Sequence, residues 1–125
     1  MRLLLDSHAL YWWVAGSGRL SATARGLIVD RANVVIVSAV SIYEIAWKAR
    51  RGRVALPSQE LRAALRRNGV DDLAITHDHA DYAAQLDWDH RDPWDRLLAA
   101  QARLENCSLV SVDAVFDAIG VDRTW

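Results

Sequence analysis

The sequence has only one cysteine, Cys107, which excludes an internal disulfide framework and a zinc site built from several cysteines. With only two prolines and six glycines, no linker divides it, so we expect one domain over residues 1–125. Its apolar runs are far shorter than the roughly 20 residues that a membrane span requires. The short, acid-interrupted start does not resemble a secretory signal. We therefore expect a cytoplasmic protein without a membrane partner.

An excess of charge of one sign is also lacking, because the formal net charge is −1. Its distribution is uneven. Residues 44–69 hold seven lysines and arginines against two glutamates, and residues 70–100 hold eight aspartates against two arginines. Solvated helix faces would explain both segments. The alternative is a basic rim for a nucleic-acid backbone, with Arg50, Arg51 and Arg53 as candidate ligands, beside an acidic metal pocket.

Apolar segments with the periods of strands and helices alternate along the chain. We expect strands at 2–6, 34–37 (a β-branched run, buried on both faces), 73–75 and 109–112, with a last one near 119–121. We expect helices at 7–15, from Ser21 to Asn33, from Ser38 or Ser41 to Gly52, at 58–69, 77–86 and 92–106, and briefly after Asp113. This alternation predicts an α/β fold, a three-layer α/β/α sandwich around a mostly parallel sheet.

Four carboxylates occupy places where the chain otherwise predicts a buried core. Asp6 and Asp113 follow the apolar runs 3–5 and 109–112, whereas Glu44 and Asp95 fall within apolar helical segments. Carboxylates are costly to bury, and the ends of parallel strands are where sites form in open sheets. Repulsion among four such groups would be relieved by a hard cation such as Mg²⁺, whose preferred ligands are oxygen atoms. The pattern therefore indicates metal-dependent phosphate chemistry.

Each carboxylate also has an ordinary structural explanation. Asp6 and Asp113 could cap the helices that follow them. Glu44 could pair with Lys48 one turn later on a helix surface. Asp92, as N-cap before Pro93, could form a capping box with Asp95. The hypothesis of a shared metal site fails only if all four of these explanations are correct.

Other polar and aromatic candidates carry weaker signals. His77 and His79 do not share one helix face, so we expect solvated or capping roles rather than metal binding. Trp12 and Trp13, just after Asp6, could stack RNA bases, but core or dimer packing is favoured. A phosphoacceptor receiver is disfavoured because only one acid follows the first strand. The Gly16–Gly18 turn lacks the third glycine of a dinucleotide-binding loop.

Four stretches in this order resemble the PIN-domain ribonucleases, most closely the VapC toxins of bacterial toxin–antitoxin pairs. They are residues 3–10 (LLLDSHAL), 38–46 (SAVSIYEIA) with 48–54, 90–102 (HRDPWDRLLAAQA), and 109–113 (LVSVD) with Phe116. They span nearly the whole chain. The departures from the family pattern are mild: Ser7 and Ser111 stand where threonine is frequent, and Trp94 where phenylalanine is usual.

The resemblance implies that Asp6, Glu44, Asp95 and Asp113 hold Mg²⁺ or Mn²⁺ and carry catalysis. Ser7, Asp92 and Ser111 would orient these ligands or their waters. The implied protein is a metal-dependent endoribonuclease that hydrolyses RNA phosphodiesters. It would be a homodimeric toxin restrained by a cognate antitoxin. The alternative is a catalytically inactive PIN fold that binds RNA or a protein partner without cutting.

Overall fold

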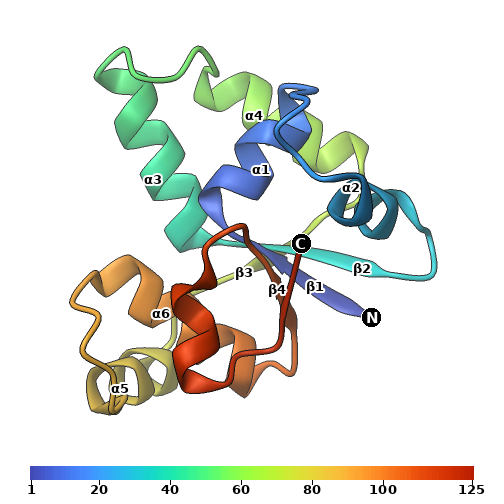
Figure 1. The fold of residues 1–125 in the computed structure, drawn as a ribbon. Coiled ribbons are helices and arrows are strands. Elements are labelled where there is room, and N and C mark those ends of the chain that lie inside the picture. The colour runs from blue at the N-terminus through green and yellow to red at the C-terminus, as the bar shows by residue number, and fades with distance from the viewer.

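The computed structural model describes all 125 residues as strands alternating with helices (Figure 1). In chain order the elements are β1 (Arg2–Leu5), α1 (Ser7–Val14), α2 (Ala22–Val29), β2 (Val34–Ser38), α3 (Ala39–Arg50), α4 (Ser58–Arg67), β3 (Asp71–Leu73), α5 (His77–Gln85), α6 (Pro93–Leu104), β4 (Ser108–Val110), the 3₁₀ helix η1 (Ala114–Ile119) and β5 (Arg123–Thr124). The expected alternation is therefore confirmed.

The five strands form one sheet in the order β3-β2-β1-β4-β5, and every neighbouring pair is parallel. The chain moves outward from β1 through β2 to β3, and then returns to the other side of β1 for β4 and β5. The direction of strand addition therefore reverses between β1 and β4. Such a switch point leaves a crevice at the carboxyl ends of the strands, where open α/β sheets bind ligands.

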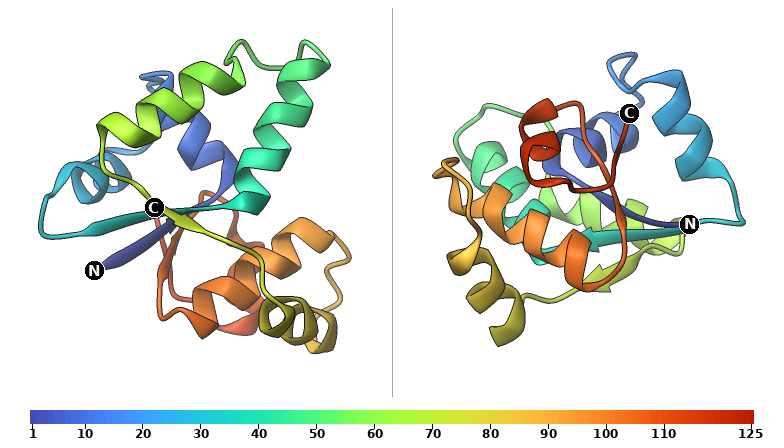
Figure 2. Two further views of the ribbon diagram at one scale, coloured as in Figure 1. Left: turned by 180° about the vertical axis from the view of Figure 1, so that it is seen from behind. Right: turned by 60° about the horizontal axis from the view of Figure 1, so that its bottom comes forward.

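Helices cover both faces of the sheet, as the views from behind and from below show (Figure 2). On one face, residues of α1, α2, α3 and α4 pack on Leu3, Leu5 and Val37 in a core of 13 buried residues. On the other face, α6 and η1 pack on Leu4, Ile36 and Leu109 in a second core of 10 buried residues. Successive residues of β1 thus enter opposite cores, which is why residues 3–5 are uninterruptedly apolar.

Two strands differ from the positions that the sequence indicated. β3 covers Asp71–Leu73 rather than 73–75, because it pairs with β2 as an edge strand with both aspartates exposed. β5 covers Arg123–Thr124 rather than 119–121, since Ile119 ends η1 and Gly120 turns the chain in the left-handed conformation at φ 67°. Val34 is also exposed, so only the later part of β2 is buried on both faces.

The structure also gives the roles of the two tryptophans, the two histidines and the two serines that the sequence left open. Trp12 and Trp13 pack against the core under α1, in agreement with the favoured interpretation. His77 is exposed, whereas His79 is buried and caps α5, since its Nδ1 accepts from the Thr76 backbone N–H at 3.0 Å. Ser38, not Ser41, caps α3; the Ser41 hydroxyl instead donates to the Leu5 carbonyl at 3.2 Å. No helix is long and apolar enough to cross a membrane.

Candidate metal centre

The carboxylates singled out in the sequence gather around the carboxyl ends of β1 and β4. Asp6 directly follows β1, and its backbone N–H donates to the carbonyl of Val110, the last residue of β4, at 3.1 Å. Glu44 comes from α3, which follows β2, and Asp95 from the first turn of α6. Asp113 lies between β4 and η1. Elements from both layers therefore supply acids to the crevice at the switch point.

Asp6 is both a helix cap and a buried acid. It is the N-cap of α1, and its Oδ1 accepts from the Ala9 backbone N–H at 2.7 Å. The cap interpretation is thus correct, but it does not bring Asp6 to the surface, since only 6% of the residue is exposed. Burial raises the pKa of this carboxyl, while hydrogen bonds from Ser111 and Ala9 oppose the rise. The fold keeps an acid where ionisation is disfavoured.

The Glu44 side chain is hydrogen-bonded by a residue of α1 and not by a residue of its own helix, α3. The Ser7 hydroxyl of α1 donates to Glu44 Oε2 at 3.2 Å. Lys48 lies within electrostatic range, but no ion pair closer than 4 Å joins the two side chains, so the alternative explanation of Glu44 as half of a surface pair is not supported. Burial raises the pKa of Glu44 more than the charge of Lys48 lowers it.

Asp95 departs from the capping box considered for it. Asp92 is indeed the N-cap of α6, and its Oδ1 accepts from the backbone N–H groups of Trp94 and Asp95 at 2.9 and 3.4 Å. The Asp95 side chain instead accepts from His90, with Nε2 and Oδ2 2.6 Å apart. Burial raises the pKa of Asp95, although this histidine opposes the rise. The carboxylate is therefore bonded to the loop that carries His90 rather than to the backbone of Asp92.

Asp113 is the exposed member of the four. Its Oδ1 caps η1 by accepting from the Val115 backbone N–H at 3.0 Å, and its own backbone N–H donates to the Ser111 hydroxyl at 3.1 Å. Arg123 fastens this turn from β5, donating to the Ser111 carbonyl at 3.0 Å and through two nitrogens to Asp117 at 2.8 Å. Ser111 thus links the backbone of Asp113 to the side chain of Asp6.

The four carboxylates affect one another electrostatically. The charge of Asp113 raises the pKa of both Asp6 and Asp95, and the charges of Asp95 and Asp92 raise the pKa of Glu44. Each acid therefore lies near another, and three of them are disfavoured in the charged form by burial and repulsion together. Such an arrangement is typical of a functional site rather than of a solvated surface.

A tighter group stands at one edge of this site. The candidate ligand atoms of His90, Asp92 and Asp95 all lie within 4.8 Å of one another. Only Asp95 belongs to the four predicted carboxylates, and Asp92 was expected in a supporting role. His90 was not singled out for the site. The signal available in the sequence was its position in the HRDPWD segment, which places it beside the first turn of α6.

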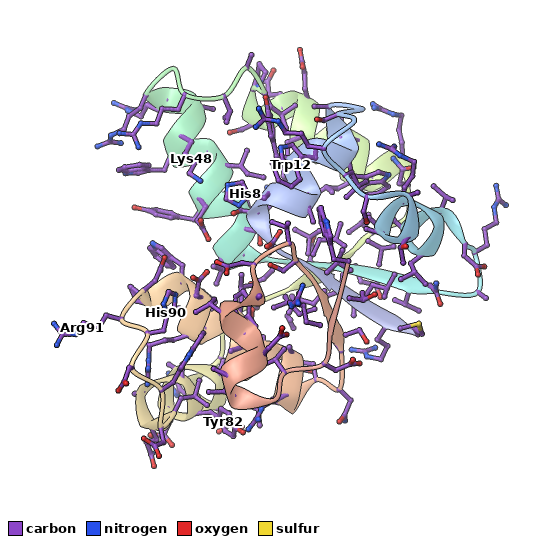
Figure 3. The ribbon with its side chains drawn as sticks, viewed as in Figure 1. His8, Trp12, Lys48, Tyr82, His90 and Arg91 are labelled. Atoms are coloured by element: carbon purple, nitrogen blue, oxygen red, sulfur yellow. The ribbon has the colours of Figure 1, made fainter.

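Arg96 is a second residue that sequence reasoning missed. Its guanidinium donates to four backbone carbonyls: Ala83 at 3.1 Å, Leu86 at 2.7 Å, Trp88 at 2.7 Å and His90 at 3.1 Å. The five donors of an arginine suit such a hub. Arg96 therefore fixes the 86–90 segment against α6 and places His90 beside Asp95. Figure 3 labels His90 on this segment, below the level of α3.

The candidate RNA-binding arginines lie apart from the carboxylates, at the end of α3. Arg50 is its last residue, and Arg51 and Arg53 follow in the exposed turn. The Arg51 guanidinium carbon stands 3.7 Å from the centre of the Trp47 ring, and that of Arg53 stands 5.7 Å from it. Glu44 and Lys48 lie on the same helix, so the basic end and the acidic crevice are joined by α3 (Figure 3).

Comparisons with known proteins agree with this architecture. Residues 3–122 match the family described as the PIN domain. The chain is 37% identical over 114 residues to Ribonuclease VapC22 of Mycobacterium tuberculosis, which covers 89% of this chain and 86% of that protein. The structure of VapBC2 from Rickettsia felis, bound to a promoter DNA fragment, matches with a TM-score of 0.72 at 16% identity, covering 99% of this chain and 98% of that one.

A second solved structure shares the fold. VapC20 of Mycobacterium tuberculosis, a sarcin–ricin loop cleaving toxin, matches with a TM-score of 0.67 at 22% identity and covers 95% of each chain. At these low identities the two structures establish the fold alone. The family itself rests on the domain match over residues 3–122 and on the 37% identity to VapC22. This chain therefore belongs to the PIN-domain family and is a relative of the VapC ribonucleases.

Proposed function

We propose that this protein is a Mg²⁺- or Mn²⁺-dependent endoribonuclease that acts as the toxin of a toxin–antitoxin pair. The observation that carries the proposal is the set of Asp6, Glu44 and Asp95, three partly or fully buried carboxylates whose pKa values are raised. Asp6 and Asp113 follow the two strands that flank the switch point of the sheet, and the charge of Asp113 acts on both Asp6 and Asp95. We also infer that residues 1–125 form one domain, since both cores pack on the same sheet.

The donor set fits a hard divalent cation. In Glu44, Asp95 and Asp113 one carboxylate oxygen accepts a hydrogen bond, whereas Oε1, Oδ1 and Oδ2 respectively accept none. These open oxygens, with Asp6, would hold the ion, and they are the ligand type that Mg²⁺ and Mn²⁺ prefer. A cation would also offset the burial, and the smaller repulsion among the acids, that raise the three pKa values. The site contains no thiolate, so softer metals have no advantage.

The chain's own groups would organise hydrolysis in the following way. A bound divalent ion acidifies water and offsets negative charge on a phosphodiester. Glu44 and Asp95 would hold the ion through their one open oxygen each and would thereby fix the position of the attacking water. Ser7 fixes the rotamer of Glu44 and opposes the rise of its pKa that burial causes, because the Ser7 hydroxyl donates to the charged form. Ser111 does the same for Asp6, and Asp92 fixes the start of α6 and therefore Asp95.

The same site suggests how the activity would be restrained. An antitoxin that covers the crevice with an arginine would form charge-assisted hydrogen bonds to the open carboxylate oxygens and compete with the cation. The Rickettsia felis neighbour is VapBC2 bound to promoter DNA, and a further neighbour is a toxin–antitoxin complex from Klebsiella pneumoniae. We therefore propose a cognate antitoxin as a partner of this chain, together with RNA as substrate and assembly as a homodimer.

The experiment that tests this function is cleavage of a pool of structured RNAs by purified protein free of antitoxin. We expect cutting at few sites with Mg²⁺ or Mn²⁺, none with EDTA, and cutting lowered on the order of 100-fold or more in the Asp6→Asn variant. If folded wild-type protein binds RNA but cuts nothing under any of these conditions, the protein is the non-catalytic PIN-fold module instead.

A further inference from the structure

His90, Asp92 and Asp95 form a group of possible metal ligands that differs in chemistry from the four strand-end carboxylates. One ligand atom of each residue lies within 4.8 Å of those of the other two. A zinc ion stands about 2 Å from each nitrogen or oxygen ligand, so the ligands of one ion are roughly 3–4 Å apart. Small side-chain rotations are therefore enough to bring these three residues into the coordination shell of one cation.

The three side chains offer free ligand atoms and are open to solvent. Asp92 caps α6 with Oδ1 only, and its Oδ2 accepts no hydrogen bond. His90 Nε2 lies 2.6 Å from Asp95 Oδ2, and an ion bound by both atoms would replace this hydrogen bond. The side chains of His90 and Asp95 are 28% and 23% exposed, so an ion can reach them from solvent.

The histidine is held in position by its surroundings. Arg96 donates to the His90 carbonyl at 3.1 Å, and the His90 ring lies against that of Trp88, with 4.7 Å between the ring centres. Trp88 in turn packs against the buried Phe116, with 5.8 Å between the ring centres. A ligand whose backbone and ring are both fixed loses little conformational freedom on binding, which favours affinity.

The nitrogen atom decides which ion this group prefers. Mg²⁺ takes oxygen ligands, which the four strand-end carboxylates provide. Imidazole suits Zn²⁺, and three protein ligands that leave one position open are the pattern of zinc sites that keep a water. Mn²⁺ stands at the weak end of the affinity order of the divalent transition metals, below Co²⁺ and Zn²⁺. The group therefore discriminates against the ions of the proposed nuclease centre.

We propose that His90, Asp92 and Asp95 form a second cation site, which binds Zn²⁺ and is distinct from the strand-end centre. The site takes its nitrogen ligand from the 86–90 segment and its two carboxylates from the start of α6 (Figure 3). The other three strand-end carboxylates take no part in it. Binding of Zn²⁺ here does not depend on the proposed endoribonuclease function.

The two sites share Asp95, so binding at one affects binding at the other. Asp95 Oδ2 faces His90, whereas its Oδ1 accepts no hydrogen bond and is open to the strand-end ion. Two cations that divide the charge of one carboxylate repel each other, so Zn²⁺ and Mg²⁺ weaken each other's binding reciprocally. This regulation rests on the proposed function: Zn²⁺ restrains the nuclease by raising the Mg²⁺ concentration that it needs.

The binding test uses Co²⁺ as a spectroscopic substitute for Zn²⁺, because its visible absorption reports the ligands of the bound ion. Co²⁺ is titrated into metal-free protein, and Zn²⁺ is then added to displace it. We expect an absorption band in wild type that Zn²⁺ abolishes, and affinity at least about 10-fold lower in His90→Gln and in Asp92→Asn. Asparagine caps helices as well as aspartate does, so Asp92→Asn removes the charge and leaves α6 capped.

Two control variants separate this site from other places that an ion can occupy. Asp6→Asn disables the strand-end centre and should bind Co²⁺ like wild type. His77→Gln removes an exposed histidine from α5 and should also leave binding unchanged. Thermal melting without metal checks that each variant is folded. The proposal is overturned if wild type gives no Co²⁺ band, if His90→Gln and Asp92→Asn bind like wild type, or if Asp6→Asn loses the ion.

Cleavage at a series of Mg²⁺ concentrations tests the regulation. Zn²⁺ should raise the Mg²⁺ concentration for half-maximal cleavage on the order of 10-fold in wild type and should have less effect in His90→Gln. Equal shifts in the two proteins would overturn the regulation. If wild type cuts no RNA but binds Co²⁺ through His90, the cation site stands and the nuclease fails. If it cuts RNA and has no Co²⁺ band, the nuclease stands and the cation site fails.

Discussion

Two parts of this molecule are rich in acids, and they differ in what the fold does with them. At the carboxyl ends of β1 and β4, Asp6 is buried, and Glu44 and Asp95 are partly buried; the pKa values of all three are raised. Around α5, the aspartates at positions 78, 81 and 87 are exposed to solvent. The second region contributes three of the eight aspartates of residues 70–100, and none of these three is buried.

The difference shows that a count of charges does not locate a site of this kind. An exposed aspartate remains hydrated, so it has little to gain from a cation. A carboxylate that folding has desolvated gains both a ligand and a neutralising charge when a cation binds. A large hollow beside α5, of about 760 Å³, is lined by Thr76, His79 and the exposed acids. Its His79 is already used in capping and is bonded to Glu105 at 2.8 Å.

The largest difference between the two regions should appear when one acid in each is neutralised. Asp6→Asn should lower RNA cleavage on the order of 100- to 1,000-fold, because the cation loses a buried ligand at the centre of the site. Asp78→Asn in α5 should leave cleavage within about 2-fold, as expected for a surface substitution. Initial rates on one RNA at saturating Mg²⁺ measure both. Equal losses in the two variants would remove the distinction between the regions.

Arg96 connects α6 to α5 and to the 86–90 segment, so its removal should lower the stability of the protein. Arg96→Met leaves the carbonyls of Ala83, Leu86, Trp88 and His90 without their donor. We expect a loss of about 2–4 kcal/mol in the free energy of unfolding and a loosened His90–Asp95 contact. Urea titration monitored by tryptophan fluorescence measures the change. Arg91→Met, at an exposed site beside it, should cost less than about 0.5 kcal/mol.

The response of stability to pH should also separate the two regions. Asp6 and Glu44 have pKa values raised from ordinary values of 3.8 and 4.5, so the folded protein binds protons more tightly than the unfolded chain. Their favourable contribution is fully present below those ordinary values and is lost as pH rises through the raised folded values. We therefore expect the metal-free protein to have a higher Tm near pH 5 than near pH 7.5.

Substitution isolates the contribution of the strand-end acids to this pH response. Glu44→Gln should raise the metal-free Tm at pH 7.5 and flatten its dependence on pH, whereas Asp81→Asn should change neither. Added Mg²⁺ should raise the Tm of the wild type more at pH 7.5 than at pH 5, since only ionised carboxylates bind it. A wild-type Tm that rises steadily from pH 5 to pH 7.5 without metal would show that burial at the strand ends has been misjudged.

The smallest effect that we predict concerns Ser7. Ser7→Ala removes the hydroxyl that donates to Glu44 Oε2 and should raise the pKa of Glu44 further. Cleavage should fall about 10-fold at neutral pH, with part of the loss regained at higher pH as Glu44 ionises. Ser58→Ala at the start of α4, distant from the crevice, serves as the matched control. A loss that is the same at every pH would assign Ser7 a packing role only.

Much of the fold could be predicted from the chain because the apolar runs at 3–5, 34–37 and 109–112 are typical of strands in a covered parallel sheet, although Val34 and Val112 at the ends of these runs are exposed. The edge strands could not. Asp71 and Asp72 have low β propensity, and β3 exists because its backbone pairs with Ile36 and Val37 of β2. Likewise, β5 is placed by pairing of Arg123 with Leu109 rather than by its own composition.

In the candidate site, too, the roles set by neighbouring residues could be predicted, and those set by distant segments could not. Asp6 and Asp92 reveal themselves as caps from neighbouring residues alone, and each does cap a helix. Their convergence with Glu44 depends on how α3 and α6 cross the sheet edge, which spacing alone does not give. His90 and Arg96 were missed because their roles depend on backbone carbonyls and a carboxylate brought to them by the 86–90 turn.

Cation binding itself tests the central claim, that burial at the strand ends makes a divalent site and charge around α5 does not. We would titrate Mn²⁺ into the metal-free protein and follow the free ion by electron paramagnetic resonance, for wild type, Asp6→Asn, Asp95→Asn and Asp78→Asn. Wild type and Asp78→Asn should bind Mn²⁺ alike, and the other two variants should bind it at least about 10-fold more weakly. Unchanged binding by Asp6→Asn and Asp95→Asn, with loss in Asp78→Asn, would contradict the account.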